Sequence, residues 1–282
     1  MIDGKLSLVL PAHNEAENIE QVVSEALIAV PRHFAGLEVI VVNDGSSDET
    51  PDIVRSMSQT DTRVRLVDHP VNRGYGAALR SGFDASTGDY VMVMDSDRQF
   101  DIGDIVYMVP FISQFDMVAG YRIQRNDPLH RTVFGKTFRL AMRTLFGVQL
   151  KDIDCAFKVM RGDILRSLPL TSEGAMISTE LMARWAQVGA TWSQVGVHHY
   201  PRTAGQQSGG SIRVIFRAMR DVPLLWLRLR REDRDVEPAS LEDEATSSSR
   251  AGSLLPTLLV TLVLAVVVGF FVRWMKSRSD QG

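Results

Sequence analysis

The stretch Val91-Met92-Val93-Met94-Asp95-Ser96-Asp97-Arg98-Gln99 changes from an apolar run to two carboxylates within a few residues. The apolar part is typical of a buried β-strand, which would end where the acidic residues begin. Side chains two positions apart in an extended segment point the same way, so Asp95 and Asp97 can face one cation. Hard oxygen ligands in an incomplete cage favour Mg²⁺ or Mn²⁺, with substrate phosphates filling the remaining positions. Taken alone, the pattern also fits a strand end with two solvated carboxylates.

The composition allows a folded domain and argues against several other classes of protein. With 282 residues, 45% hydrophobic and 23% charged, the chain can bury a full-sized core as one large domain or two small ones. A net charge of -3 gives no general attraction to nucleic acid. The single cysteine, Cys155, excludes an intramolecular disulfide framework and a thiolate metal cage, and it fits a reducing compartment.

The C-terminal part of the chain differs in composition from the rest. No residue is charged from Leu254 to Val272, and a helix rising about 1.5 Å per residue there would nearly span the roughly 30 Å hydrocarbon layer of a bilayer. A buried core helix, the alternative, usually keeps a polar face, which this stretch lacks. We therefore predict a transmembrane helix over 253–275 and a tail over 276–282. Residues 234–252 are rich in Glu, Asp and Ser and predict a solvated linker.

The segment before that linker, residues 212–233, mixes arginines with apolar residues and Trp226. It predicts a basic amphipathic segment lying on anionic lipid, with a solvated domain helix as the alternative. The orientation signals conflict, because basic residues follow the predicted span and acidic residues precede it. The N-terminus lacks the basic start and long apolar region of a signal peptide. We give this more weight and expect a single-pass cell-membrane protein whose large domain, residues 1–211, is cytoplasmic.

Strand and helix patterns alternate along the first hundred residues. Such an order predicts an α/β fold, in which a mostly parallel sheet is covered by helices on both faces. The expected strands are Leu6–Leu10, Val39–Val42, Val64–Val67 and Tyr90–Met94, and a later one is Met117–Gly120. The expected helices between them are Glu17–Ala29, Asp48–Ser58 and Gly76–Ala85.

Polar clusters follow three of these strands, at residues 11–15, 43–48 and 95–97. Ligands of open α/β sheets bind beyond the carboxyl ends of the strands, so these clusters predict one binding site. The turn after the first strand has no Gly-x-Gly-x-x-Gly, and no Walker-type Gly-Lys-Ser/Thr occurs. Asp44 is placed to accept hydrogen bonds from a base or ribose and also to cap the turn at Gly45, and both roles can hold at once. Arg73-Gly74-Tyr75-Gly76 opens a helix whose free N–H groups could receive phosphate, with an ordinary glycine-rich helix start as the alternative. We infer a nucleoside diphosphate ligand.

At this point several motifs together resemble a known family. Pro-x-x-Asn-Glu, Val-Val-Asn-Asp-Gly-Ser-Ser-Asp, Asn-x-Gly-x-Gly-Ala-Ala and Asp-x-Asp are similar to those of the family two glycosyltransferases, which have the nucleotide-sugar-binding GT-A fold. With the Gln two residues after the second Asp, the pattern Asp-x-Asp-x-Gln resembles that of dolichyl-phosphate mannose synthases and related polyprenyl-phosphate glycosyltransferases. The resemblance covers about residues 5–210. It is specific for the family and much less specific for the sugar.

The resemblance implies roles for individual residues on the donor side. Asp95, Asp97 and Gln99 would hold the metal ion. Arg202, in a loop that closes over the site, would contact phosphate, although the Ser-Lys pair usual after this loop is replaced by Gln206-Gln207. The residues that would contact the nucleotide are Pro11, His13, Glu15, Val42, Asp44, Asp95, Ser96 and Arg202.

On the acceptor side, the resemblance places Arg122 and Arg131 at the lipid phosphate. Arginine suits this task because its planar fork donates two hydrogen bonds and keeps its charge. A solvated helix face explains some of the other basic residues between 122 and 139. Lys158 stands where an Arg is usual in the family's acceptor segment, and Asp154 in the same segment is the candidate base for a hydroxyl acceptor.

The expected function is metal-dependent, inverting transfer of a sugar from GDP-mannose or a UDP-hexose to a polyprenyl phosphate, in which Asp95, Asp97 and Arg202 act on the departing diphosphate. Three alternatives stay open. A processive polysaccharide synthase would need more membrane helices than the one predicted. A transferase that modifies a glycan, lipid or protein hydroxyl would need no anchor. A non-catalytic, membrane-anchored binding module would not need its metal ligands.

Overall fold

The computed structural model describes residues 1–123, 129–202 and 221–232, with side chains of the second range from residue 138 onward. Its first half alternates strands and helices: β1 (Ile2–Ala12), α1 (Ile19–Ala29), the 3₁₀ turn η1 (Val30–Arg32), β2 (Phe34–Asp44), α2 (Thr50–Thr60), β3 (Val64–His69), α3 (Tyr75–Ala85) and β4 (Tyr90–Val93). The predicted strands and helices of this half are confirmed. Their ends differ by a few residues, most at β1 and β2, which extend beyond their apolar centres.

The second half adds η2 (Ile102–Asp104), α4 (Ile105–Ile112), β5 (Met117–Arg122), α5 (Leu129–Phe146), β6 (Lys158–Arg161), α6 (Gly162–Ser167), α7 (Ile177–Gln187) and β7 (Trp192–Val197). A further helix covers 221–232. The seven strands described form one sheet in the order β3-β2-β1-β4-β6-β5-β7. Only β6 runs against its neighbours β4 and β5, so the sheet is mostly parallel, as predicted.

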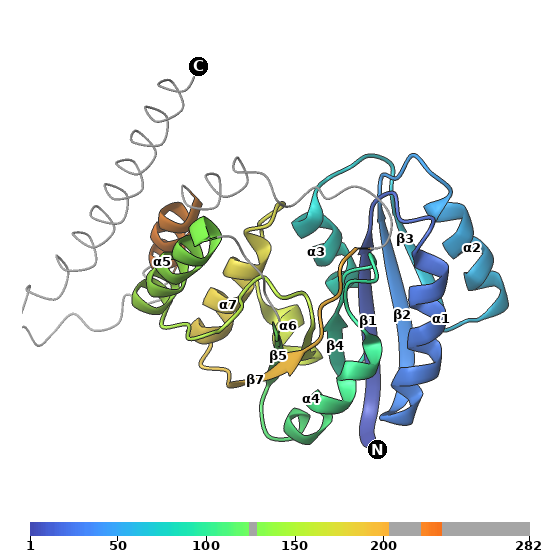
Figure 1. The fold of residues 1–282 in the computed structure, drawn as a ribbon, viewed down its shortest axis with the longest axis horizontal. Helices are drawn as coiled ribbons and strands as arrows, with labels where there is room; N and C mark the ends of the chain where they lie inside the picture. The colour runs from blue at the N-terminus through green and yellow to red at the C-terminus, as the bar shows by residue number, and fades with distance from the viewer. Residues whose placement is uncertain (124–128, 203–220, 233–282) are drawn as a thin grey trace, which may run out of the picture.

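Helices cover both faces of the sheet, with α1 and α2 on one side and α3 and α7 on the other (Figure 1). Alternate residues of β1 explain this arrangement: Leu6, Leu8 and Leu10 belong to one apolar cluster, and Val9 belongs to the other. All four side chains have no exposed surface. A strand buried on both faces requires the nearly continuous apolar run seen in the sequence.

Strand β1 lies between β2 and β4 and is parallel to both. The carboxyl ends of these three strands therefore meet at one edge of the sheet. At this edge the strand order changes direction, because β2 lies on one side of β1 and β4 lies on the other. This is the switch point at which open α/β sheets bind ligands. The three polar clusters of the sequence lie at this edge.

The predictions for the C-terminal region fall mainly outside the described residues. This is true of the linker 234–252, the span 253–275 and the tail 276–282. Of the amphipathic segment 212–233, the structure describes 221–232, which are helical. Within the ranges that the structure describes, no helix has both the length and the apolarity needed to cross a membrane.

Candidate active site at the carboxyl ends of the central strands

The turns that follow β1 and β4 have unusual backbone conformations. Asn14 after β1 and Arg98 after β4 have φ of 56° and 60°, and they are the described non-glycine residues with positive φ. Such conformations cost free energy and persist where the surroundings fix them, commonly at functional sites. At Asn14 the fixing contacts are visible, since its amide N–H donates to Ser46 Oγ at 2.9 Å and its side-chain oxygen accepts from the Ser47 amide at 2.8 Å.

The acidic pair lies between these turns. Asp95 Oδ1 accepts a hydrogen bond from the Tyr75 hydroxyl at 3.0 Å, and Asp97 Oδ1 accepts one from the backbone N–H of Gln99 at 3.1 Å. Burial and the nearby charge of Asp97 raise the pKa of Asp95 to about 6, although the bond from Tyr75 opposes this rise. Two carboxylates that repel each other at a partly buried position fit a divalent cation, which would neutralise both.

A metal ion at this edge of the sheet would have few protein ligands. Across the described part of the chain, no group of three or more His, Cys, Asp or Glu side chains could hold a metal ion. The third predicted ligand, Gln99, donates through its side-chain nitrogen to the Tyr200 carbonyl at 3.1 Å, which orients the amide. A cation held by Asp95, Asp97 and the Gln99 oxygen would keep open positions for phosphate oxygens.

Arg202 joins the ends of β1 and β4. Its guanidinium pairs with Glu15 and lies 3.9 Å from Asp97 Oδ2. Burial raises the pKa of Glu15, although hydrogen bonds from Asn18 and the charge of Arg202 act in the opposite direction. The structure thus brings the predicted phosphate ligand Arg202 next to the predicted metal ligand Asp97.

The other predicted nucleotide residues surround the same edge, where Ser96 and His13 contact neighbouring protein groups. The Ser96 hydroxyl donates to the Pro11 carbonyl at 2.7 Å, and His13 Nδ1 lies 2.9 Å from the Asp44 carbonyl. Val42 has no exposed surface and packs in the apolar cluster beneath the site. Its side chain therefore supports the site from below, instead of facing a nucleoside.

Asp44 organises the protein at this edge. Its carboxylate accepts hydrogen bonds from the amides of Arg73 and Gly74, both at 2.9 Å, and lies 2.9 Å from His69 Nδ1. The turn after β3 is therefore bound to the end of β2. Of the two roles considered for Asp44, the structure shows a capping role, although the amides it caps belong to residues 73 and 74, not to the turn at Gly45.

The helix start that follows was expected to offer free N–H groups to a phosphate, and this expectation is wrong. The amides of Gly76 and Ala77 donate to the Glu173 carbonyl at 2.8 and 3.2 Å. A carbonyl from a distant segment therefore occupies the N-terminus of α3. This contact cannot be predicted from the sequence, because the two partners are nearly a hundred positions apart.

Of the predicted acceptor residues, Arg122 ends β5, Arg131 lies in α5 and Lys158 begins β6, whereas the candidate base Asp154 lies in the loop before β6. Arg122 donates to both oxygens of Asp152, from Nε at 2.6 Å and from Nη2 at 2.9 Å. Burial opposes the charged form of Arg122, but the bond to Asp152 outweighs it and raises the pKa of the guanidinium. Asp154 is exposed nearby. The side chain of Arg131, in α5, lies outside the described residues.

Lys158 has a different environment from that expected of a phosphate ligand. It is 2% exposed, and its amine donates to the carbonyls of Ile153, at 3.0 Å, and Cys155. Burial lowers the pKa of this amine, while the surrounding acidic groups, Asp95 among them, oppose the shift. Lys158 therefore fixes the loop that carries Asp152 and Asp154, and it contributes positive charge behind Asp95.

Two side chains that the sequence left without a role belong to this site. Tyr75 is bonded to Asp95, and Asp152 is bonded to Arg122. Tyr75 stands inside the glycine-rich stretch that the sequence singled out, and Asp152 stands two positions before Asp154. Proximity to these motifs was the available signal, but the pairings depend on the folded sheet.

The fold agrees with that of known proteins. Glucosyl-3-phosphoglycerate synthase from Mycobacterium tuberculosis, solved with Mn²⁺, UDP-glucose and phosphoglyceric acid, superposes with a TM-score of 0.62 at 20% identity and covers 79% of each chain. The structure of the same enzyme with phosphoglyceric acid gives 0.62 at 21% identity, over 78% of this chain and 79% of the other. The chain thus has a GT-A-like α/β fold. Residues 7–168 match the sequence profile of Glycosyl transferase family 2, and the chain belongs to this family.

Two curated relatives are undecaprenyl-phosphate 4-deoxy-4-formamido-L-arabinose transferases. The protein of Pectobacterium atrosepticum is 30% identical over 173 residues, which cover 60% of this chain and 53% of the relative. The protein of Salmonella choleraesuis is 27% identical over 217 residues, which cover 75% and 64%. The chain therefore spans between half and two thirds of the length of these relatives.

Proposed function

We propose that this protein transfers a sugar from a nucleoside diphosphate to a polyprenyl phosphate. The observation that carries the proposal is the acidic pair Asp95 and Asp97 at the switch point of the sheet, with Arg202 beside it. Membership of the family supports the reaction class. The names of the curated relatives, which contain undecaprenyl phosphate, support the acceptor class.

In this reaction the bond between the anomeric carbon and the donor phosphate oxygen breaks, and the departing diphosphate gains negative charge. Asp95, Asp97 and Gln99 would hold a divalent ion, which when bound supplies positive charge to the diphosphate. Arg202 would exchange Glu15 for a phosphate oxygen, because a guanidinium pairs with either anion in the same forked geometry. Tyr75 keeps the carboxylate of Asp95 turned toward the site.

An oxygen of the acceptor phosphate would form the new bond to the anomeric carbon from the opposite side, which inverts its configuration. A phosphate monoester is largely ionised near neutral pH, so this step needs no general base. Arg122, held in place by Asp152, would bind the acceptor phosphate, and Arg131 would be its second ligand. For a hydroxyl acceptor, Asp154 would take the proton.

Among donors, we favour a UDP-linked sugar over GDP-mannose, because solved structures that share the fold hold UDP or UDP-glucose. Among metal ions, the same structures favour Mn²⁺, and Mg²⁺ suits the same oxygen ligands. Pro11, His13 and Glu15 would lie against the nucleotide. Val42 and Asp44 would shape its pocket from behind.

A lipid acceptor requires the site to work beside a membrane. In the helix over 221–232, Val222, Leu225 and Leu229 are buried against the domain, whereas Leu224 and Leu227 are 57% and 45% exposed. Arginines 230 and 231 are exposed as well. Exposed leucines together with arginines suit the surface of an anionic bilayer. With the span over 253–275, this face would keep the domain on the cytoplasmic side of the cell membrane.

The test offers membranes containing the protein a panel of radiolabelled sugar nucleotides, with and without a chelator. We expect one UDP-linked label to enter lipid that organic solvent extracts, and the chelator to stop this transfer. An Asp97→Asn protein serves as the control for endogenous enzymes. Label that moves only into water-soluble or protein fractions would favour a hydroxyl acceptor, and no transfer from any donor would refute the assignment.

A further inference from the structure

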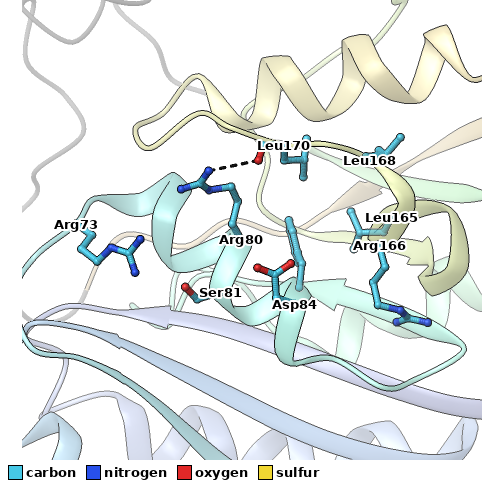
Figure 2. A pocket seen from close by; sticks show the side chains of 9 residues that line it. Arg73, Arg80, Ser81, Asp84, Leu165, Arg166, Leu168 and Leu170 are labelled. Atoms are coloured by element: carbon cyan, nitrogen blue, oxygen red, sulfur yellow. Dashed lines mark hydrogen bonds between the residues drawn. The ribbon is translucent and has the colours of Figure 1, made fainter. Parts of the chain in front are cut away.

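The Leu170–Glu173 segment lies outside the acidic pair but contacts α3, whose first residue is bonded to Asp95. In the Leu170–Glu173 segment, the Glu173 carbonyl accepts from the amides of Gly76 and Ala77 at 2.8 and 3.2 Å. Arg80, further along α3, donates to the Leu170 carbonyl at 3.3 Å (Figure 2). A cavity of about 330 Å³ lies beside this second contact. Leu170 also packs against the apolar cluster that contains residues of α3, so polar and apolar contacts together hold the segment against this helix.

The approach of this segment to α3 is close enough to require glycine. A Cβ atom on Gly76 would lie 2.5 Å from the Ser172 carbonyl oxygen and 2.7 Å from that of Gly174. Gly74 has a φ of +96°, and a Cβ there would lie 2.7 Å from the Glu173 carbonyl oxygen. The start of α3 and the Leu170–Glu173 segment therefore fit together backbone against backbone, so a shift of one moves the other.

The carboxylate of Glu180, in α7, holds the segment from its other side. Glu180 has no exposed surface. It accepts hydrogen bonds from the amides of Thr171 and Ser172, at 3.1 and 2.7 Å, and from the Thr171 hydroxyl at 3.0 Å. Burial alone would raise the pKa of Glu180, but these bonds and Arg184 lower it, so the group is charged at neutral pH.

Two arginines from different helices balance the charge of Glu180. Arg184 donates to it from the next turn of α7 at 3.1 Å, and Arg228 donates from the 221–232 helix at 2.8 Å. Arg184 also bonds to Glu232 at 2.8 Å, which closes the network. The helix that we place at the membrane is thus ion-paired to the residue that holds the Leu170–Glu173 segment.

The opposite end of this chain of contacts is the metal site itself. Tyr75, the first residue of α3, donates to Asp95, and the amide of Gly74 donates to Asp44. Every step between Arg228 and Asp95 is therefore a hydrogen bond or a backbone contact. The Arg228 side chain, at the helix end of this chain of contacts, is 40% exposed, whereas the Glu180 carboxylate that it meets is fully buried.

We propose that Glu180 is a positioning residue that couples the 221–232 helix to the metal site by way of the Leu170–Glu173 segment and α3. The inference rests on the proposed function, because it concerns the same acidic pair. Positioning of this kind means that contact of the helix with a membrane strengthens binding of metal ion and nucleotide. The coupling needs a charged group at 180, since a neutral amide cannot balance both guanidinium groups.

The experiment measures binding instead of turnover. Full-length protein in detergent is titrated with Mn²⁺ in the presence of UDP, and bound Mn²⁺ is followed by electron paramagnetic resonance. We expect Glu180→Gln and Arg228→Met each to weaken Mn²⁺ binding by about tenfold, within the usual range of coupling between sites. Donor KM should rise in parallel, whereas kcat at saturating metal and donor should change little.

Two controls separate positioning from general loss of stability. Arg161→Met removes an exposed arginine–aspartate pair at the end of the sheet remote from the site, since Arg161 pairs with Tyr90, the first residue of β4. Asp116→Asn removes a carboxylate that caps Thr191, with bonds of 2.8 and 2.7 Å. Both control proteins should bind Mn²⁺ and UDP like the wild type, even where Asp116→Asn lowers Tm.

The outcomes are distinct. Wild-type protein that binds neither Mn²⁺ nor UDP would overturn the proposed function. Wild-type protein that binds both, together with unchanged binding in Arg228→Met, would overturn the coupling and leave the function standing. If Glu180→Gln does not fold, Arg228→Met decides the matter. In the Arg228→Met protein, Arg184 still balances the charge of the Glu180 carboxylate.

Discussion

Asp97 is the residue on which the proposed chemistry depends most directly. Replacing it with Asn keeps the size and the bond from the Gln99 amide but removes the charge that would hold a divalent ion. We expect kcat to fall by a factor of about a hundred or more, as it does when a main electrostatic contact is lost. Transfer assays over a range of Mn²⁺ concentrations check this. Activity close to that of wild type would remove the metal role from this residue.

Arg122 is the residue predicted to bind the acceptor. Arg122→Ala should raise the KM for polyprenyl phosphate by roughly tenfold to a hundredfold, the range expected for a lost charge-assisted hydrogen bond. Donor KM should change much less. Because Arg122 also pairs with Asp152, Asp152→Asn is the matched variant, which keeps the guanidinium but loosens it. A larger effect on donor KM than on acceptor KM would mean that the two sites are exchanged.

At this scale the sequence predicted which residues gather, but not always what they contact. Asp95, Asp97 and Glu15 come together because they follow parallel strands that lie side by side, and Arg202 was expected beside them from the resemblance to the family. Lys158 and Val42 differ, since whether a side chain faces a ligand or the core depends on packing by other elements. Asp44 was recognised as polar and well placed, and its partners became known only when residues 69–74 were seen beside it.

Among the elements, α3 is the most constrained by its surroundings. Gly76→Ala would force a Cβ against two carbonyl oxygens, and we expect the free energy of unfolding to fall by about 1–3 kcal/mol, as in other overpacked sites. Gly174→Ala is the matched control, because a Cβ there would meet nothing within 4 Å. Thermal unfolding of both proteins checks the difference. Equal Tm values would show that α3 and its neighbour can separate at no cost.

The strands and helices of the first half were predictable because each has its own apolar pattern and a polar turn on either side. The second half was harder. Strand β6 has four residues and pairs in the antiparallel sense with β4 and β5, so its place between them depends on pairing rather than on its own sequence. The 221–232 helix was expected from its composition. Its ion pairs with α7 were not, because they join residues 48 positions apart.

For the molecule as a whole, one buried carboxylate links stability to pH. Burial alone would raise the pKa of Glu38, but hydrogen bonds from Ser7, Thr87 and Lys5 lower it from 4.5 to about 2. A carboxyl whose pKa is lower in the folded protein contributes fully above its unfolded pKa, and this contribution is lost as the pH falls toward the folded value. Wild-type protein should therefore lose stability between about pH 5 and about pH 2.

Glu38→Gln tests this link. The variant should be less stable near neutral pH by roughly 1–3 kcal/mol, because buried donors lose a charged acceptor. Its stability should also fall less than that of wild type as the solution is acidified. Chemical unfolding at several pH values measures both effects. A variant whose stability follows the wild-type pH curve would show that other groups cause the acid sensitivity.

The reversed direction of β6 has a consequence for how acceptor choice can evolve. Because β5 ends and β6 begins at the same edge of the sheet, the whole stretch from 123 to 157 leaves and re-enters at one place. Arg122, at the end of β5, and Lys158, at the start of β6, lie at the two ends of this stretch. Under the proposed function this stretch contains Arg131 and Asp154, so a graft of the matching stretch from another member of the family would change the acceptor without changing the register of β1, β2 and β4.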